Sequence, residues 1–312
     1  MPEPPSHIAR RERRRAQLRR RRLTAAGTLA LVVLLAIVAF AATSGSVPTR
    51  RGGRSASGSG RSQANGGVVR PAAASGSRER AESRAVGRLA RFGLPVYCAG
   101  PRGDAVAFTF DDGPGPYTHY ALKKLRQAHE RATFFAVGRS IDYFPGYLVR
   151  ELRVAVIGDH TYTHPVLTGL SPAAAESEIA RTAHKIQAQT GQPVELFRPP
   201  YGARNASIDA TARRLGLLEI LWNVDSADSL GANYAGITRN VEAGMHPGSI
   251  ILMHENRGQT IRALTTLLPE LRRRHLRSVT LPQLLSADPP SLAQLRAGPN
   301  GCGGSVLHGG GG

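Results

Sequence analysis

The sequence has almost no excess of basic over acidic residues in the part of the chain that is expected to fold, residues 92–312. Lysine and aspartate are absent from residues 1–91, which hold 19 arginines and 4 glutamates and so carry +15 of the formal net charge of +19. Residues 92–312 carry only +4. A nucleic-acid-binding domain places its basic residues on folded elements beside aromatic or groove-reading partners. Here the arginines lie in a tail and a linker, which argues against nucleic acid as a partner.

Charged residues are absent from residues 23–42, LTAAGTLALVVLLAIVAFAA. About 20 uncharged residues are enough for a helix to cross a hydrocarbon core of roughly 30 Å. Nine arginines precede this stretch and three follow it closely, so the positive-inside rule makes residues 1–22 a basic cytoplasmic tail and puts the later residues outside the cell. We therefore predict a single-pass signal anchor in the cell membrane. The alternative is a signal peptide cleaved near Ala39-Phe40-Ala41, which predicts a secreted protein.

Large apolar side chains are almost absent from residues 43–87, which are rich in Gly, Ser, Ala and Arg. Such a segment buries too little apolar surface to offset the entropy of ordering it. We predict a disordered linker there, long enough to let an anchored domain reach into a cell wall. Residues 287–312 are rich in Pro and Gly and predict a tail without a core of its own. Residues 88–286 remain as the folded domain, in which we find no internal repeat.

Cysteine is scarce: the chain has two, Cys98 and Cys302, on either side of the predicted domain. Both fall on the predicted outer side of the membrane, where disulfides persist. A bridge between them would tie the two ends of the domain together, and closing so long a loop is worth on the order of 4 to 5 kcal/mol in the chain-entropy model. The alternative is two unpaired thiols.

From about Gly93, short apolar runs alternate with helical stretches, which predicts parallel strands with helices outside them, an α/β fold. A helix is expected over Tyr117–His129. A second begins at Ser171-Pro172, a favourable cap followed by a first-turn proline, and ends at Gly191. The predicted strands are Ala105–Phe110, Thr133–Val137, Val154–Gly158, Val194–Phe197, Leu217–Val224 and Ser249–Met253.

Polar motifs follow these predicted strands. They are Thr109-Phe110-Asp111-Asp112-Gly113-Pro114, which overlaps the end of its strand, His160-Thr161-Tyr162-Thr163-His164, Arg198-Pro199-Pro200-Tyr201, the pair Asp225 and Asp228, and Leu252-Met253-His254. Side chains at the carboxyl ends of parallel strands meet on one face of an α/β barrel, which is where such barrels hold their active sites. Together the motifs offer metal ligands, a spare carboxylate, an arginine and a spare histidine, a set suited to hydrolysing an acyl bond.

The spacing of His160 and His164 is typical of histidines that bind zinc or a related metal from one side of a turn. The pair alone is a weak indication, because two hydrogen-bonded structural histidines show the same spacing. No base lies between them, so a third ligand and a base must come from elsewhere. Asp111 and Asp112 offer both, although Asp-Asp-Gly-Pro by itself is also typical of a solvated turn.

The joint order of the five motifs resembles the polysaccharide deacetylase family, the NodB-type carbohydrate esterases of family 4. The resemblance implies an irregular β/α barrel of about seven units. It implies that Asp112, His160 and His164 bind one divalent metal ion, with zinc preferred and cobalt, nickel or manganese as alternatives.

The same resemblance implies roles for the remaining motif residues. Asp111 is the expected catalytic base, and Arg198 orients it. His254 is the expected general acid, with Asp225 as the carboxylate that raises its pKa. The backbone N–H of Tyr201 would contact the oxyanion, and Leu252 would line the pocket for the acetyl methyl group. Ser229 stands where the family usually has tryptophan, which puts the shape of that pocket and the substrate preference in doubt.

The sequence therefore predicts a membrane-tethered, extracytoplasmic, monomeric deacetylase of an N-acetylated polysaccharide. Peptidoglycan suits an outward-facing enzyme that reaches the wall; chitin-type oligomers come next, and an O-acetyl polysaccharide is a further alternative. Two other classes remain open. A glycoside hydrolase also uses paired carboxylates, although it needs them apart across the sugar. A non-catalytic wall-binding module is the second.

Overall fold

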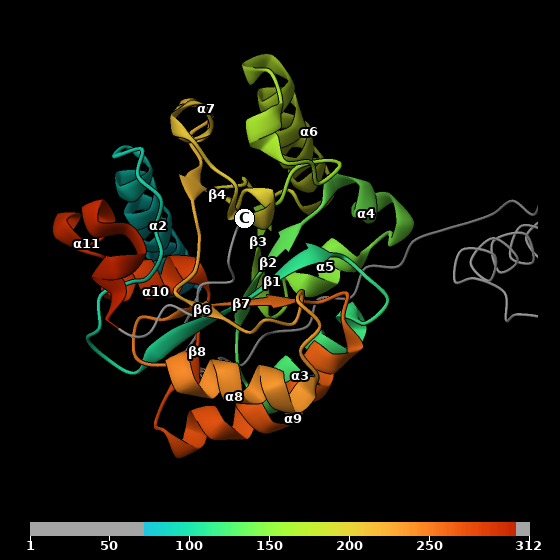
Figure 1. Ribbon diagram of the computed structural model, residues 1–312, viewed down its shortest axis with the longest axis vertical. Coiled ribbons are helices and arrows are strands. Elements are labelled where there is room, and N and C mark those ends of the chain that lie inside the picture. Colours follow the sequence, from blue (N-terminus) through green and yellow to red (C-terminus); the bar gives the residue numbers. More distant parts are fainter. Residues whose placement is uncertain (1–71, 304–312) are drawn as a thin grey trace, which may run out of the picture. The chain divides into compact units, whose positions relative to one another are not determined.

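The computed structural model describes residues 72–303, in which strands and helices alternate along the chain (Figure 1). The predicted basic tail, signal anchor and most of the predicted linker lie outside the described residues. Within residues 72–303, no helix combines the length and the apolar character that crossing a bilayer requires. The elements are α2 Ala72–Ala90, β1 Ala105–Gly113, α3 Thr118–Ala128, β2 Ala132–Ala136, α4 Gly138–Tyr143, α5 Tyr147–Glu151, β3 Ala155–Asp159, η1 Leu167–Gly169, α6 Pro172–Thr190, β4 Leu196–Phe197, η2 Pro200–Gly202, α7 Ala206–Arg214, β5 Leu218–Glu219, β6 Val224–Asp225, α8 Tyr234–Gly244, β7 Ile250–His254, α9 Gly258–Arg273, β8 Arg277–Ser278, α10 Leu281–Ala287, α11 Leu292–Ala297 and η3 Gly298–Cys302.

All strand pairs in the sheet are parallel, as the strand and helix alternation predicts. The strand order is β5-β4-β3-β2-β1-β7-β6, with β8 paired beside the start of β1. Residues 217–224, expected to form one strand, instead form β5 and β6 at the two opposite edges of the sheet. Only four residues separate these strands, and an extended chain spans at most about 3.6 Å per residue. The sheet must therefore curl until its edges nearly meet, as an open barrel.

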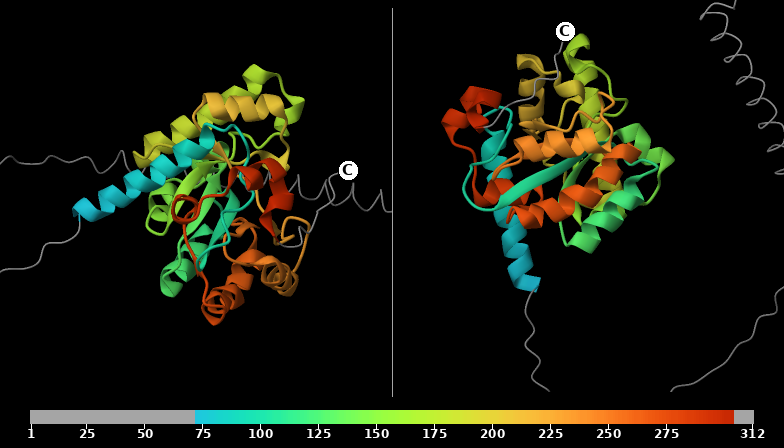
Figure 2. Two further views of the ribbon diagram at one scale, coloured as in Figure 1. Left: turned by 90° about the vertical axis from the view of Figure 1, so that its left-hand side faces the viewer. Right: turned by 60° about the horizontal axis from the view of Figure 1, so that its bottom comes forward.

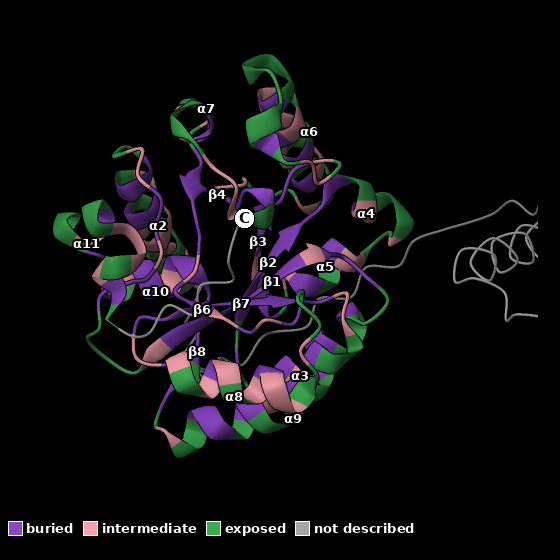
Figure 3. Ribbon diagram, in the orientation of Figure 1, coloured by how far each residue is buried: buried purple, intermediate pink, exposed green. Residues whose placement is uncertain are grey.

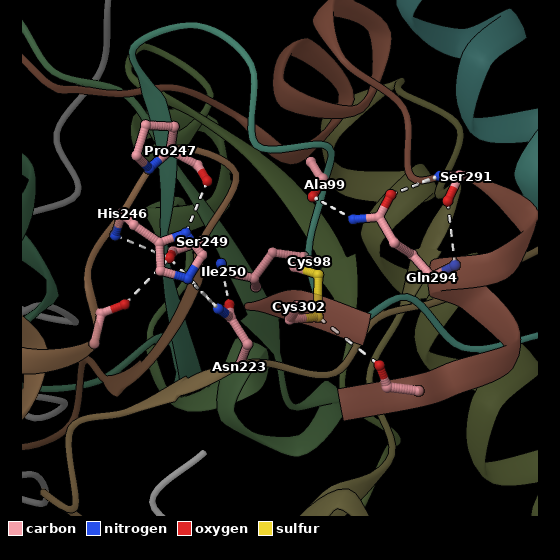
Figure 4. Close-up of a disulfide and its surroundings, with 12 residues drawn as sticks. Cys98, Ala99, Asn223, His246, Pro247, Ser249, Ile250, Ser291, Gln294 and Cys302 are labelled. Carbon is pink, nitrogen blue, oxygen red and sulfur yellow. Dashed lines mark hydrogen bonds between the residues drawn. A yellow bond between two sulfur atoms is a disulfide. The ribbon is translucent and has the colours of Figure 1, made fainter. Parts of the chain in front are cut away.

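The segment before β1 spans the gap between the two edges. The Val96 N–H donates to the Glu219 carbonyl at 2.9 Å, and the Val96 carbonyl accepts from the Leu221 N–H at 2.8 Å. Two residues later the backbone of Cys98 pairs with that of Ser249, directly before β7, in an isolated antiparallel β-bridge. Cys98 is disulfide-bonded to Cys302, as predicted, so the bridge ties the C-terminal end of the domain to this closing segment (Figure 4).

Apolar side chains fill both faces of the curled sheet. On the outer face, β1, β2 and β7 pack against α3, α8 and α9 through residues such as Phe108, Phe134, Leu125, Ile237 and Leu264. Side chains of alternate strand residues point to the inner face, where Ala107, Phe135, Leu196 and Ile250 meet α2 and α10. The strands are accordingly buried and the helices expose only their outward sides (Figure 3). Continuous apolar runs such as AVAFTF are what strands covered on both faces require.

The folded domain extends further at both ends than the sequence predicts. Helix α2 covers residues expected to belong to the linker, and its Val86 and Leu89 pack into the inner core. Its first turns project from the body of the domain (Figure 2). At the other end Leu295 is buried in the same core, and the carboxylate of Asp288 bonds the guanidinium of Arg102. Small and charged side chains dominate both segments, so their few buried positions give no clear apolar pattern.

The predicted caps are confirmed at α6. The Ser171 hydroxyl accepts from the Ala174 N–H at 3.3 Å, Pro172 occupies the first turn, and Gly191 ends the helix at φ 70°. Glycine suits this position because a positive φ costs it little. The cap matters for the site, because α6 follows the two-histidine motif and lies against the strand that precedes it.

Candidate metal and catalytic site

The five motifs converge at the carboxyl ends of the strands, as predicted. Asp111 on β1 lies in register with His254 on β7. His160 directly follows β3, and Arg198 directly follows β4, where its N–H donates to the Asp159 carbonyl at 2.9 Å. Asp225 ends β6. Parallel pairing brings these residues, which span residues 111 to 254 of the sequence, to one edge of the sheet.

Asp112, His160 and His164 form the one group of three or more metal-ligand side chains found among residues 72–303. One ligand atom from each lies within 4.8 Å of the others. The Asp112 Oδ1 atom is 3.2 Å from His164 Nε2 and 3.7 Å from His160 Nε2. Asp112 has φ 70°, so its side chain leaves the direction set by the strand and turns toward the histidines. Two imidazoles and a carboxylate fit a catalytic zinc-type site, which keeps further positions open.

The surroundings of the ligands suit metal binding. His160 Nδ1 lies 2.7 Å from the Arg198 carbonyl, so the ring donates there and leaves Nε2 free to ligate. Burial lowers the pKa of His160 to about 3, which keeps the ring neutral, the form that binds metal. The Asn256 amide donates to Asp112 Oδ2 at 3.3 Å and leaves Oδ1 facing the histidines.

Arg198 is fully buried and makes hydrogen bonds with each part of its guanidinium. Its Nη1 atom donates to Asp111 Oδ1 and to Thr109 Oγ1, both at 2.8 Å. The Nε and Nη2 atoms donate to the carbonyls of Ile220 and Leu221, both at 3.2 Å. This network fixes the guanidinium and with it the Asp111 carboxylate, as the sequence motif predicts.

Asp111 combines the features of a base that works near neutral pH. It is almost completely buried, and its second oxygen lies 3.6 Å from His160 Nε2, beside the metal ligands. Burial raises the pKa of Asp111, and the nearby Arg198 charge offsets part of that increase. A raised pKa makes the carboxylate a stronger base, while the guanidinium favours its ionised form.

The carboxylate that holds His254 is Asp228, and the prediction of Asp225 is wrong. Asp228 Oδ1 lies 2.6 Å from His254 Nδ1, and Oδ2 accepts from the His254 backbone N–H at 2.8 Å and from the Thr260 hydroxyl at 2.5 Å. Asp225 Oδ1 instead accepts from the Ala227 N–H at 2.7 Å and so fixes the turn after β6. The turn redirects the chain after β6, so that Asp228 and not Asp225 reaches the His254 ring.

His254 is placed to act as an acid. Burial lowers its pKa, but the hydrogen bond and the charge of Asp228 outweigh burial and raise the pKa to about 9. The ring is therefore protonated at neutral pH, and its Nδ1 proton is directed to Asp228. The Nε2 side remains to carry a proton to a substrate.

Tyr201, Trp222 and Leu252 border the site. Tyr201 has φ 62°, the residue is 68% exposed, and its ring centre lies 4.7 Å from that of His164. Trp222 packs beside the backbone of Gly202, where an added Cβ would meet the indole at 3.0 Å. An aromatic ring therefore stands beside this loop although Ser229 replaces the usual tryptophan. Leu252 is buried and paired in register with Thr109 and Asp225, on the side of β7 that also carries His254.

Several contributing residues escaped prediction from the sequence. Thr109, Asn256 and Thr260 each make a side-chain hydrogen bond to a motif residue. Asn256 and Thr260 lie outside the motifs, and Thr109 begins the first motif without a predicted partner. Asp228 was part of a motif, but the resemblance assigned the role of its carboxylate to Asp225. The spacing of motifs in the sequence indicates which strand end such residues are near, but it does not show which group each of them bonds.

Comparisons with known proteins place this site in a family. A family model described as polysaccharide deacetylase matches residues 99–220. A peptidoglycan-N-acetylglucosamine deacetylase of Bacillus cereus is 35% identical over 193 residues, which cover 60% of this chain and 70% of that protein. A chitooligosaccharide deacetylase of Bradyrhizobium is 33% identical over 58% of this chain and 90% of its own length.

A solved structure with the same fold comes from Bacillus anthracis and is a pseudoenzyme of the CE4 family. It superposes with a TM-score of 0.59 at 28% identity and covers 62% of this chain and 69% of that one. The relatives, the matched family model and the converged motifs agree. The chain therefore belongs to the polysaccharide deacetylase family and is a hydrolase of that class.

Proposed function

We propose that this protein removes N-acetyl groups from a cell-wall polysaccharide, with peptidoglycan as the first candidate substrate and one divalent metal ion as cofactor. One observation carries the proposal: Asp112, His160 and His164 meet within 4.8 Å, with a buried carboxylate, Asp111, and a protonated imidazole, His254, beside them. A site with both a base and an acid next to metal ligands is equipped to hydrolyse an amide.

The ligand set would hold a zinc-type ion, which supplies Lewis acidity at the acetyl oxygen and lowers the pKa of water. Asp111 then takes the proton of the attacking water while Arg198 keeps its carboxylate in place. The backbone N–H of Tyr201 is the proposed donor to the oxyanion, a role that backbone amides fill in other acyl-transfer enzymes. Leu252, and Trp222 beside Gly202, are the candidates for the acetyl pocket.

His254 completes the reaction by protonating the sugar nitrogen as its bond to the acetyl carbon breaks. Asp228 holds the ring through Nδ1 and stabilises its charged form, so Nε2 donates the proton. The products are acetate and a free amine, and the proton taken by Asp111 replaces the one given by His254. Adjacent Asp111 and Asp112 do not suit glycoside hydrolysis, in which the two carboxyl groups stand about 5 Å or more apart on either side of the sugar bond.

Peptidoglycan is supported as the substrate by the Bacillus cereus relative and by the predicted anchor of residues 23–42, which would place the domain outside the membrane and near the wall. The Cys98–Cys302 disulfide suits the same oxidising compartment. The Bradyrhizobium relative makes chitin-type oligomers the second candidate, and an O-acetyl ester remains open to the same groups.

The experiment is acetate release by the purified full-length chain from peptidoglycan and from chitin oligomers. We expect acetate from at least one of them, its loss after treatment with a chelator, and its return with Zn²⁺ or Co²⁺. New reducing ends without acetate would favour a glycoside hydrolase. Sugar binding by the metal-loaded protein without acetate release would make this chain a non-catalytic module, as the pseudoenzyme in its family shows can occur.

A further inference from the structure

In the loop that joins the two histidine ligands, side chains accept the backbone N–H groups, while the carbonyls of Thr161 and Tyr162 accept from the backbone N–H groups of Gly138 and Arg139 at 2.9 Å. Four consecutive backbone N–H groups, of Thr161, Tyr162, Thr163 and His164, donate to side-chain oxygens. The acceptors are Asp159 Oδ1 for Thr161, at 2.7 Å, and Thr161 Oγ1 for His164, at 3.2 Å. The N–H groups of Tyr162 and Thr163, between the two histidines, both donate to one carboxylate oxygen, Glu178 Oε2.

Glu178 reaches this loop from helix α6. Its Oε2 atom accepts from the N–H groups of Tyr162 and Thr163 at 3.0 and 2.7 Å, and its Oε1 atom accepts from the Thr163 hydroxyl at 3.0 Å. Bonds to an ionised acceptor are stronger than neutral ones. The Glu178 carboxylate therefore bonds both Tyr162 and Thr163, the two residues that precede His164.

The loop needs such support because its backbone is unfavourable. Thr161 and His164 have φ of 65° and 62°, in the left-handed region, and Thr161 is β-branched. Each non-glycine residue in that region costs roughly 1 kcal/mol or more. These two conformations turn His164 back toward Asp112, 3.2 Å from its Oδ1. Without the bonds to Glu178, we expect the chain to relax and the distance between the two imidazoles to vary.

We propose that Glu178 is a positioning residue of the metal site, which holds His164 at the distance from His160 that one ion requires. The proposal rests on the proposed metal-dependent function, and it goes beyond the ligands themselves. Glu178 belongs to the next layer around them, since its carboxylate bonds the loop and not a ligand side chain. Such outer partners typically change metal affinity by about 10- to 100-fold when they are removed.

The experiment measures the Kd of Zn²⁺ for the folded full-length chain by chelator competition, together with the absorption spectrum of bound Co²⁺. Glu178→Ala is expected to raise the Kd by about 10- to 100-fold and to alter the Co²⁺ spectrum. The matched control is Glu176→Ala, two positions away on the same helix, where the carboxylate pairs with Arg214 at 2.7 Å. The control is expected to bind Zn²⁺ like the unchanged chain.

Two milder variants keep the test decisive if Glu178→Ala does not fold. Glu178→Gln can still accept both backbone bonds and donate to Thr163, so it should recover most of the lost affinity. Thr163→Val removes one of the three bonds and should weaken binding less than the alanine change does. If all Glu178 variants bind Zn²⁺ as tightly as the control, and only their metal-free unfolding temperature falls, Glu178 is merely structural and the proposal is wrong. If the unchanged chain binds no metal, the proposed function itself fails.

Discussion

Replacing Asp111 by asparagine is expected to lower kcat for acetate release by about 10²- to 10⁴-fold, the contribution typical of a positioned proton acceptor. The amide keeps the shape of the side chain, and its oxygen can still accept from Arg198 Nη1, 2.8 Å away. What it loses is the ability to take a proton from the attacking water. Because Asp111 is not one of the three proposed ligands, the variant should still bind one metal ion per chain.

The matched control is Asp104→Asn, immediately before the same strand at its opposite end. Asp104 is exposed and pairs with Arg277 at 3.2 Å, far from the motif residues along β1. This variant should keep its full kcat. If Asp111→Asn with metal bound retained kcat within tenfold of the unchanged enzyme, another group would have to be the base.

Replacing Asp228 by asparagine is expected to lower kcat by about 100-fold or more, because the general acid then loses the partner that orients and charges it. The pH profile gives a sharper test. His254 must be protonated to donate, so activity is lost as the pH rises through its pKa. Asp228 raises that pKa to about 9. Its removal should therefore shift the alkaline limb of the profile to lower pH.

Asp225→Asn is the comparison that separates the two aspartates. Asp225 bonds the Ala227 N–H and not the His254 ring, and an asparagine oxygen can accept the same backbone bond. We expect a small loss of kcat and an alkaline limb close to that of the unchanged enzyme. A larger shift for Asp225→Asn than for Asp228→Asn would contradict the assignment of Asp228 as the partner of His254.

The sequence predicts the elements whose signals are local. Ser171, Pro172 and Gly191 bound α6 because a cap, a first-turn proline and a positive-φ glycine act within a few residues of themselves. Strand-end motifs predict that these residues meet at one edge, because parallel pairing carries strand ends together; the roles of metal ligand, base and acid come from the resemblance to the polysaccharide deacetylase family. The class of fold follows from the same alternation of strands and helices.

Long-range features were missed or misplaced. The apolar run of residues 217–224 looks like one strand, but in the closed sheet its start pairs with β4, its middle pairs with Val96 and its end pairs with β7. Helix α2 places only Val86, Leu89 and Ala90 in the inner core, and these follow a long stretch of small and charged residues that gives no apolar pattern. The choice between Asp225 and Asp228 depends on a turn at Ala227, with φ 58°, that spacing alone does not reveal. Glu178 lies 14 residues beyond His164, on a helix that approaches the loop only in the folded chain.

The most direct test is anomalous diffraction from crystals of the protein grown with Zn²⁺. The account predicts one strong peak bonded to Asp112, His160 and His164 at about 2.0 to 2.2 Å from each ligand atom. Asp111 should lie beside it without being a ligand. A zinc ion bound elsewhere, or the three side chains left without an ion in protein that releases acetate, would contradict the account.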